Sequence, residues 1–290
     1  MSSSTTDAAQ ELIDAGIADA FTQETFNDSE TGEALSYNIF LPADYDPTKA
    51  YPMVLYIADS SLVGQDVTAP LNQYGALIWA SEAEQAKHES IVVVPEYPSV
   101  IIDDHGSFTT TDYVDMTARL VQNIGDEYNV DTDRVYGTGQ SMGAMTVMYL
   151  AAQQPELFAA ELIVSGQWDP DQLQGLTEET FTYVAAAGDE NSSGGQSDVE
   201  ALLDDAGVAY ATGSDWDATW DTAKLDAAAQ EMYASGDAAN FATFAAGTVL
   251  TASGQSADSS GAGSSEHMAS FEPAYKIEAL RDWLFEQSAA

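Results

Sequence analysis

The sequence predicts an α/β protein built around a mostly parallel central sheet. Short apolar runs such as MVLYIA at 53–58 and IVVVPEYP at 91–98 are typical of strands that are buried on both faces. Segments with helical spacing, such as TDYVDMTARLVQNIGDEY at 111–128, alternate with these runs. This alternation predicts repeated strand, helix, strand units, in which parallel strands are covered by helices.

The chain is expected to form one main domain. We place it at residues 33–290, after an N-terminal extension with an entry helix at 1–32, because no repeat or interdomain linker divides the rest. The expected strands are 35–41, an edge strand that ends at Pro42, then 53–58, 91–98, 134–139, 159–166, 181–188 and 208–212. The expected helices are 7–19, 70–87, 111–128, 143–154, 198–207 and 275–287.

Residues 213–240 are expected to be a helical insertion before the last strand. They carry Trp216, Trp220 and Tyr233, for which two interpretations exist. Aromatic side chains at helical spacing are more commonly packing residues, and the alternative is a lid or substrate platform over a site. The Gly/Ser-rich stretch TASGQSADSSGAGSSE at 251–266 is expected to be a polar loop.

The composition excludes several classes of partner. The chain has 48 acidic and 7 basic residues, a formal net charge of -41, which would repel a nucleic-acid backbone or an anionic membrane surface. It has no run of about 18 apolar residues, so membrane insertion is not expected. It has no cysteine, which excludes disulfides and thiolate metal sites. The oligomeric state is not predicted.

The start of the chain bears on localisation. MSSSTTDAAQ lacks the basic and apolar parts of a signal peptide, but a Ser/Thr-rich start is typical of what remains after a signal or lipoprotein anchor has been replaced. We therefore expect an extracellular or cell-surface protein. The alternative is the cytoplasm of a halophile, because a large excess of carboxylates also serves as an adaptation to salt.

The stretch GTGQSMGAM at 137–145 predicts a catalytic nucleophile. It contains G-x-S-x-G around Ser141, between an expected strand and an expected helix, which is the context that gives this pattern its meaning. The sharp turn leaves no room for side chains beside the serine. The helix that follows presents free N–H groups and a positive dipole end to a developing oxyanion. The alternative is a serine in an ordinary tight turn.

A nucleophilic serine needs a base, and the chain contains only three histidines, His88, His105 and His267. In α/β folds that carry G-x-S-x-G between a strand and a helix, the catalytic residues follow the order serine, acid, histidine along the chain. Only His267 follows Ser141. It lies in the polar stretch before the last helix, and the alternative is a solvated loop histidine. His88 ends a helix and His105 lies in a DDHG turn, so both are expected to be structural.

The acid should lie between Ser141 and His267, at the end of a strand. Asp189 immediately follows FTYVAAAG and is therefore the first candidate for the residue that orients the imidazole. Glu190 is the first alternative and Asp169, in GQWDP, the second. No cofactor or metal is expected, because DWDATWD and DPDQ lack the ligand spacing of a calcium loop.

Most of residues 33–287 resembles the α/β-hydrolase superfamily. The resemblance is to bacterial serine esterases and predicted peptidases, including feruloyl-esterase-like and polyhydroxybutyrate-depolymerase-like proteins. It rests on SYNIFLPADYDPTKAYPMVLYIA, DRVYGTGQSMGAMTVMYLAAQQPELFAAELIVSG, VAAAGDE and SSEHMASFEPAYKIEALRDWLFEQ. It implies an α/β-hydrolase fold, with Ser141 as nucleophile, Asp189 as acid and His267 as base.

The loop after the first buried strand departs from this family. Family members usually carry a His-Gly-rich oxyanion loop there, whereas this chain has ADSSLVG at 58–64, with Ala58 and Asp59 in place of the His and Gly. The oxyanion donors would be the backbone N–H groups of Met142 and of Ser60 or Ser61, which do not depend on a side chain. The negative charge of Asp59 would disfavour an oxyanion nearby, unless the Asp59 side chain points away from the site or pairs with a cation.

The expected function is that of a metal-independent serine hydrolase that cleaves carboxylic esters through an acyl-enzyme. The substrate would be a small or polymer-attached ester. One alternative is a peptidase of the prolyl-oligopeptidase type. Another is a catalytically weak binding protein on a hydrolase scaffold, because of the unusual loop at 58–64.

Overall fold

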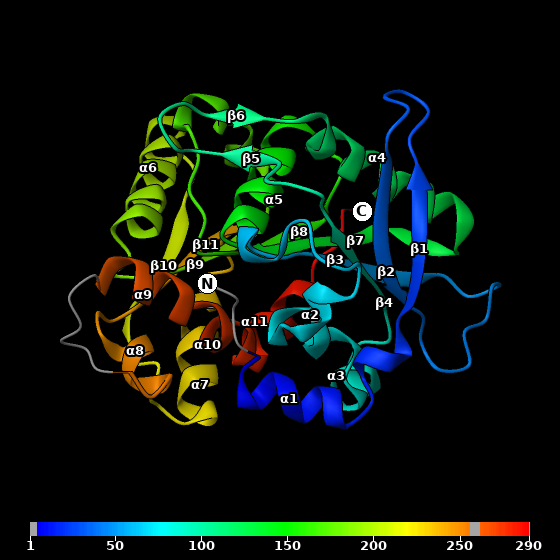
Figure 1. Cartoon of the computed structure of the whole chain (residues 1–290). Coiled ribbons are helices and arrows are strands. Elements are labelled where there is room, and N and C mark those ends of the chain that lie inside the picture. Colours follow the sequence, from blue (N-terminus) through cyan, green and yellow to red (C-terminus); the bar gives the residue numbers. More distant parts are fainter. Residues whose placement is uncertain (1–4, 256–261, 290) are drawn as a thin grey trace.

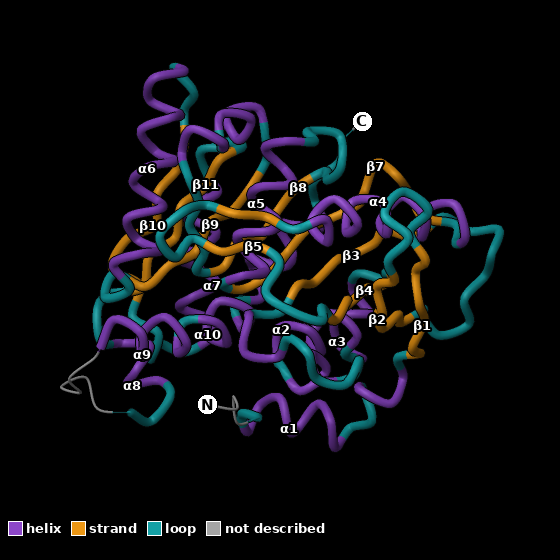
Figure 2. The backbone as a smooth tube through the Cα atoms, turned by 45° about the horizontal axis from the view of Figure 1, so that its top comes forward, coloured by secondary structure: helices purple, strands orange, loops and turns teal. Residues whose placement is uncertain are grey.

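A nine-stranded sheet forms the centre of the computed structural model, which describes residues 5–255 and 262–289 (Figures 1 and 2). Its strand order is β1-β2-β4-β3-β7-β8-β9-β11-β10, and β5 and β6 pair separately. The strands are β1 (Thr22–Asn27), β2 (Ala34–Phe40), β3 (Tyr51–Ile57), β4 (Ile91–Glu96), β5 (Ile102–Asp103), β6 (Thr109–Thr110), β7 (Val130–Gln140), β8 (Ala160–Val164), β9 (Phe181–Ala186), β10 (Tyr210–Trp216) and β11 (Ala239–Phe244).

The sheet is parallel from β4 to β10, and β1 and β2 run antiparallel at one side. This confirms the predicted fold class. Every residue of β3, β4, β8 and β9 is buried, as continuous apolar strands covered on both faces should be. The carboxyl ends of the parallel strands therefore meet at one edge, where ligands bind in open α/β sheets.

The prediction of an edge strand at 35–41 is wrong, because β1 pairs along the outer side of β2 from Thr22↔Ile39 to Asn27↔Ala34. The strand itself ends at Phe40, as expected. The sequence of β1, TQETFN, contains a single large apolar residue and is mostly exposed, so it shows no pattern of burial. Residues 1–32 thus contribute a strand to the main sheet as well as an entry helix.

Helices cover both faces of the sheet (Figure 1). On one face α4, α5 and α6 pack on a core that includes Leu120, Met148 and Leu203. On the other, α2, α7, α10 and α11 pack on a second core that includes Tyr275 and Leu280. The helices are α1 (Asp7–Asp14), α2 (Tyr74–Leu77), α3 (Glu82–Lys87), α4 (Asp112–Glu127), α5 (Met142–Gln153), α6 (Glu190–Ala206), α7 (Thr222–Tyr233), α8 (Thr248–Ala252), α9 (Ala262–Ala269), α10 (Phe271–Lys276) and α11 (Glu278–Phe285).

Two predicted helices are interrupted. The expected helix at 70–87 consists of α2, α3 and short 3₁₀ turns, because Ser81 adopts an extended conformation and caps α3 by accepting from the N–H of Glu84. The expected helix at 275–287 is divided by the extended residue Ile277 into α10 and α11. In the described part of the chain, no helix is both long and apolar enough to cross a membrane.

Residues 213–240 form the end of β10, α7 and the start of β11, a regular strand, helix, strand unit. A helix does precede the last strand, and two of the three aromatic residues of the segment, one at the end of β10 and one at the end of α7, are packed against other parts of the protein. Trp216 is buried against Phe244, and Tyr233 stacks on Trp283 with ring centroids 5.0 Å apart. The packing interpretation therefore holds for these two residues, and the structure gives no support to a lid.

One carboxyl group in the sheet has no hydrogen-bond partner among the described residues. Glu161 on β8 is fully buried, and neither of its carboxyl oxygens is bonded within the described residues. Burial, and to a lesser degree the charge of Glu179, raises the pKa of Glu161 well above its ordinary value. Burial also raises the pKa of Glu179 to about 7. The folded protein therefore retains protons here at a pH where the unfolded chain has lost them.

The pKa of a glutamate in the unfolded chain is about 4.3. The free energy of unfolding is expected to fall as the pH rises from this value towards the raised pKa of Glu161 in the folded protein. In this window the folded state binds more protons than the unfolded state, so one such group lowers stability by about 1.4 kcal/mol per pH unit. E161Q cannot ionise, and urea unfolding at several pH values should show a shallower decline for it. The surface variant E190Q should keep the wild-type slope. Parallel profiles for wild type and E161Q would contradict this assignment.

Candidate active site

Ser141 lies in a sharp turn between β7 and α5. Its φ of 53° and ψ of -116° lie in a region that a residue with a side chain rarely adopts, and such strain persists only where the surroundings impose it. Two glycines make the turn possible. A Cβ at Gly143 would lie 1.9 Å from the carbonyl oxygen of Ile57, and one at Gly139 would lie 2.5 Å from the backbone of Gly143. The turn therefore presses β3, β7 and α5 together and presents the serine at the carboxyl edge of the sheet.

The structure brings Ser141, His267 and Asp189 together in one hydrogen-bonded chain. His267 Nε2 lies 2.8 Å from Ser141 Oγ, and His267 Nδ1 lies 2.6 Å from Asp189 Oδ2. These contacts are consistent with a serine hydroxyl that donates to Nε2 and an imidazole Nδ1–H that donates to the carboxylate. The three residues are 126 and 78 positions apart in the sequence and come from the end of β7, the loop after β9 and α9.

Asp189 is held in a charged form by its neighbours. It is buried at the start of α6, where Ser192 Oγ donates to Oδ2 at 2.6 Å and the N–H of Ser192 caps towards Oδ1. Burial by itself raises the pKa of the carboxyl, but the hydrogen bond and charge of His267 and the bonds from Ser192 outweigh it, so the pKa is lowered. The carboxylate is therefore ionised at neutral pH and can stabilise an imidazolium.

His267 lies on a helix, which corrects the expectation of a loop at 251–266. Residues 248–252 form α8 and residues 262–269 form α9, and residues 256–261 lie outside the described part of the chain. Two residues that follow α9 directly in the chain contact His267. The ring of Phe271 meets the imidazole edge to face with centroids 5.1 Å apart, and Ser270 Oγ donates to the carbonyl of His267 at 2.7 Å.

The other candidate residues make different contacts. His88 stacks on Phe285 and its Nε2 lies 2.7 Å from Asp282 Oδ1, whereas His105 is an exposed turn residue next to Asp103. The two alternatives to Asp189 differ from it in their surroundings. Glu190 is exposed, and Asp169 caps a 3₁₀ turn by accepting from the N–H of Asp171 at 3.1 Å. Within the described residues, none of these four candidates is bonded to Ser141 or to His267.

The loop after β3 leaves Ser60 as the candidate oxyanion donor on that side. Asp59 caps the short 3₁₀ turn Ser60–Leu62, and its Oδ1 accepts from the N–H of Ser61 at 2.9 Å. The N–H of Ser61 is therefore engaged, which removes it from the expected donors. Met142 is the first residue of α5, and the first N–H groups of a helix have no acceptor within the helix.

The carboxylate of Asp59 is buried, and among the described residues it forms no ion pair with a basic side chain. The residue is 3% exposed, and its Oδ2 accepts from Gln73 Nε2 at 2.6 Å and from Gln140 Nε2 at 2.8 Å. Gln140 immediately precedes the nucleophile. Asp59 therefore joins the loop after β3 to the turn that carries Ser141. A buried carboxylate often pairs with a cation, and here neutral amide and backbone N–H groups donate to it instead.

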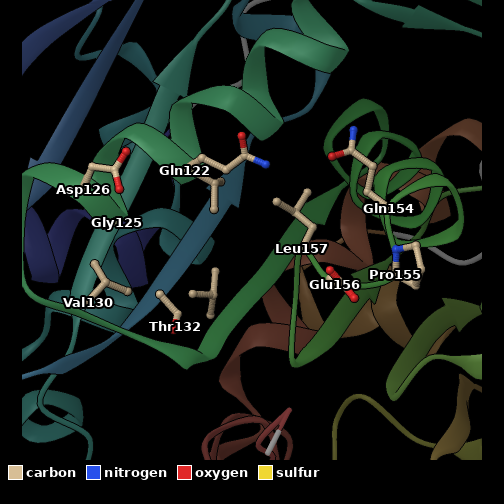
Figure 3. Close-up of a pocket in the computed structure, with 11 residues that line it drawn as sticks. Gln122, Gly125, Asp126, Val130, Thr132, Gln154, Pro155, Glu156 and Leu157 are labelled. Carbon is tan, nitrogen blue, oxygen red and sulfur yellow. The ribbon is translucent and has the colours of Figure 1, made fainter.

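Two hollows of the surface lie apart from this site. A groove of about 540 Å³ lies between α4 and the end of α5, near the start of β7, whereas Ser141 follows the end of that strand (Figure 3). A second, of about 470 Å³, borders the loop after β3 and is lined by Gly64, Gln65, Asp66, Thr68, Ala69 and Asn72. Neither is lined by Ser141, Asp189 or His267.

Among the described residues, two groups of side chains have the composition of a metal site, and both are separate from the serine. Their possible ligand atoms lie within 4.8 Å of one another, and the groups are Glu84, His88 and Asp282, and Asp103, Asp104 and His105. In the first group Lys87 and Arg281 already pair with the carboxylates. The second lies in an exposed turn. Neither group contacts the Ser141 chain of hydrogen bonds in the described residues.

Comparison with known proteins agrees with this fold. Residues 29–272 match the family described as "Putative esterase". The chain belongs to this esterase family. Over 94% of its length it also superposes on 64% of a thermostable esterase, with a TM-score of 0.70 at 24% identity, and on a ferulic acid esterase with a TM-score of 0.52 at 14% identity over 79% of this chain and 90% of that one. These likenesses confirm the α/β-hydrolase fold that the sequence motifs implied.

The chain matches only part of each of two curated relatives. It is 37% identical to acetylxylan esterase A of Emericella nidulans over 33% of this chain and 40% of that protein. It is 28% identical to dipeptidyl-peptidase 5 of Porphyromonas gingivalis over 53% of this chain and 22% of that protein. The chain thus spans less than half the length of these two relatives, and one is named as an esterase and the other as a peptidase.

Proposed function

We propose that this protein is a serine hydrolase that cleaves carboxylic esters through an acyl-enzyme. The observation that carries the proposal is the chain of hydrogen bonds from Ser141 Oγ through His267 to Asp189, at a strained turn between a strand and a helix. A nucleophile, a base within hydrogen-bond reach and a carboxylate that orients the base are the parts this chemistry needs. Membership of the esterase family supports the same reaction class.

In the proposed reaction, Ser141 Oγ forms a bond to the ester carbonyl carbon while His267 Nε2 takes the hydroxyl proton. The carbonyl oxygen becomes an oxyanion, which the N–H groups of Met142 and Ser60 stabilise. His267 then gives the proton to the departing alcohol as the acyl-enzyme forms. A water molecule then attacks the acyl carbon while His267 takes one of its protons. The bond from this carbon to Ser141 Oγ breaks, the carboxylic acid leaves, and His267 returns the proton to Ser141. Asp189 stays ionised throughout and stabilises the imidazolium.

The proposed substrates are small or polymer-attached esters. Acetylxylan esterase A is named for a polymer, and a polymer of that kind is met outside the cell or at its surface, where we propose that this protein acts. The second candidate activity is cleavage of peptide amides, which the similarity to dipeptidyl-peptidase 5 favours. A panel of aryl, acetyl-sugar and polyester substrates, run beside dipeptidyl p-nitroanilides, distinguishes the two. Turnover of the anilides alone would replace the ester proposal by the peptidase.

A fluorophosphonate probe tests whether the site is catalytic at all. It is expected to label wild-type protein at Ser141, because such probes react with a serine only when a base activates it. Peptide mapping by mass spectrometry identifies the labelled residue. The third candidate, a binding protein on a hydrolase scaffold, would leave Ser141 unlabelled and all esters intact.

The D59N variant is expected to lower kcat by about tenfold to a hundredfold. Loss of the Asp59 bonds should displace the oxyanion donor on the same loop, which reduces stabilisation of the transition state more than it reduces substrate binding. An asparagine has one acceptor oxygen, so it cannot bond all of the N–H groups that Asp59 accepts from Ser61, Gln73 and Gln140. Steady-state kinetics should show little change in KM. D66N, at an exposed position of the same loop, is the matched control. Wild-type kcat in D59N would show that this network does not support the oxyanion donors.

A further inference from the structure

We infer that Glu266 is a positioning residue that fixes the distance between Asp189 and His267; the inference rests on the proposed function. Glu266 is 4% exposed, and each of its carboxylate oxygens accepts one backbone N–H. Oε2 accepts from Gly188 at 3.1 Å, and Oε1 accepts from Gly247 at 2.7 Å. The carboxylate therefore joins α9 to the loop after β9 and to the loop after β11.

The positions of these contacts in the chain give them their meaning. Gly188 immediately precedes Asp189, and Glu266 immediately precedes His267. One buried side chain thus holds the neighbour of the acid against the neighbour of the base. The 2.6 Å contact between Asp189 Oδ2 and His267 Nδ1 lies next to this bond and joins the same two segments. In Figure 1 α9 lies beside α8, which starts directly after Gly247.

The fit around the carboxylate is close. A Cβ at Gly188 would lie 2.2 Å from the carboxyl carbon and from one oxygen of Glu266. Space and not backbone conformation excludes a side chain there, because Gly188 does not have a positive φ. Any residue with a side chain at this position would displace the Glu266 carboxylate. Because Glu266 precedes His267, this would also disturb the contact between His267 and Asp189.

A second bond holds the other end of α9 and does not reach the acid. Ser270 Oγ lies 2.6 Å from Ser165 Oγ, at the end of β8. Ser165 and Ser270 thus fix α9 relative to the sheet, whereas Glu266 fixes it relative to the loop of Asp189. Loss of Glu266 should therefore change the geometry between Asp189 and His267 while leaving the fold in place.

The chemistry of the site explains why a carboxylate is needed. A buried carboxylate close to Asp189 in a chain with a net charge of -41 is unfavourable unless hydrogen bonds compensate it. Two backbone donors do so, and bonds to a charged acceptor are stronger than those to a neutral one. A glutamine can accept only one of the two N–H groups and turns its own NH₂ towards the other.

The experiment compares E266Q with D28N in the full chain. Asp28 is also a buried carboxylate, held by Arg119 and Thr31 away from the candidate site, so D28N measures the general effect of removing such a charge. E266Q is expected to lower kcat for p-nitrophenyl acetate by about tenfold to a hundredfold with KM within about twofold, because misplacement of about 1 Å has effects of this size. D28N should lower the melting temperature and leave kcat unchanged.

A spectroscopic readout follows the contact itself. The Nδ1–H of His267, which is hydrogen-bonded to the buried Asp189, should give a downfield proton resonance. His88 and His105 are not expected to give such a resonance, because the aspartates that they contact are partly exposed. In E266Q this resonance should shift or broaden, and in D28N it should not. Wild-type kcat together with an unchanged resonance in E266Q would overturn the inference, as would an equal loss of kcat in D28N.

A double variant separates positioning from folding. G188A should reproduce the kinetic defect, because its Cβ displaces Glu266, and in an E266A background it should add nothing further. Additive defects would overturn the inference. If wild-type protein hydrolyses no ester, the proposed function fails, whereas the resonance still tests whether Glu266 positions the pair. If esters are hydrolysed and the resonance is insensitive to Glu266, only the inference fails.

Discussion

S141A is expected to reduce kcat/KM for p-nitrophenyl acetate by about four to six orders of magnitude, the range seen when a catalytic serine is removed. The variant retains Cβ, so the strained backbone at φ 53° carries no new clash, and the N–H of residue 141 can still donate to the carbonyl of Val164. The melting temperature should therefore stay at the wild-type value. Initial rates and thermal unfolding of the purified variant check both statements.

S60A is the matched control for this variant. Ser60 lies in the loop opposite the nucleophile, and its proposed contribution is a backbone N–H, which alanine keeps. Its activity should remain close to that of wild type. Retention of a tenth or more of the wild-type rate by S141A would require another nucleophile and would end the proposal of an acyl-enzyme on Ser141.

D189N is expected to lower kcat by about 10⁴-fold, because an amide in place of the carboxylate permits the wrong imidazole tautomer and cannot stabilise the imidazolium. The lowered pKa of Asp189 means that the wild-type carboxylate is ionised well below neutral pH. The loss in D189N should therefore persist across the neutral range and should not be recovered at higher pH. A pH profile of kcat from acidic to alkaline buffer makes the measurement.

S192A serves as the control for D189N. It removes the hydroxyl that donates to Asp189 Oδ2 but keeps the carboxylate and its contact with His267. The expected loss is about tenfold to a hundredfold, because one hydrogen bond to a charged group contributes about 1.5 to 3 kcal/mol and about 1.4 kcal/mol corresponds to a factor of ten. If D189N lost no more activity than S192A, the imidazole would be oriented by another group, and Glu190 and Asp169 would have to be tested in turn.

Local patterns were sufficient for much of the fold and for the position of Ser141. Strands such as β3 and β4 are apolar throughout because both faces are covered, so their sequences reveal them without any tertiary information. The turn around Ser141 needs glycines on both sides for the same local reason. Among three histidines, the order of residues along the chain was enough to single out His267.

Elements that depend on distant contacts were missed or drawn differently. The polar strand β1 is recognisable only from its pairing with β2. The helix that carries His267 follows a Gly/Ser-rich stretch, and Ser270 and Glu266 hold it through contacts with other parts of the fold. The aromatic residues of the segment 213–240 are compatible with a lid or with packing until their partners Phe244 and Trp283 are known.

The sequence by itself determined the alternation of strands and helices, the turn at Ser141 and the order of the candidate residues, because these follow from burial and turn geometry within short segments. Only the tertiary structure decided what individual carboxylates do. The chain has 48 acidic residues, and nothing in its local patterns shows where a side chain points. Asp59 bonds to a glutamine 81 positions away and Glu266 to a glycine 78 positions away, and such contacts exist only once the fold has brought these segments together.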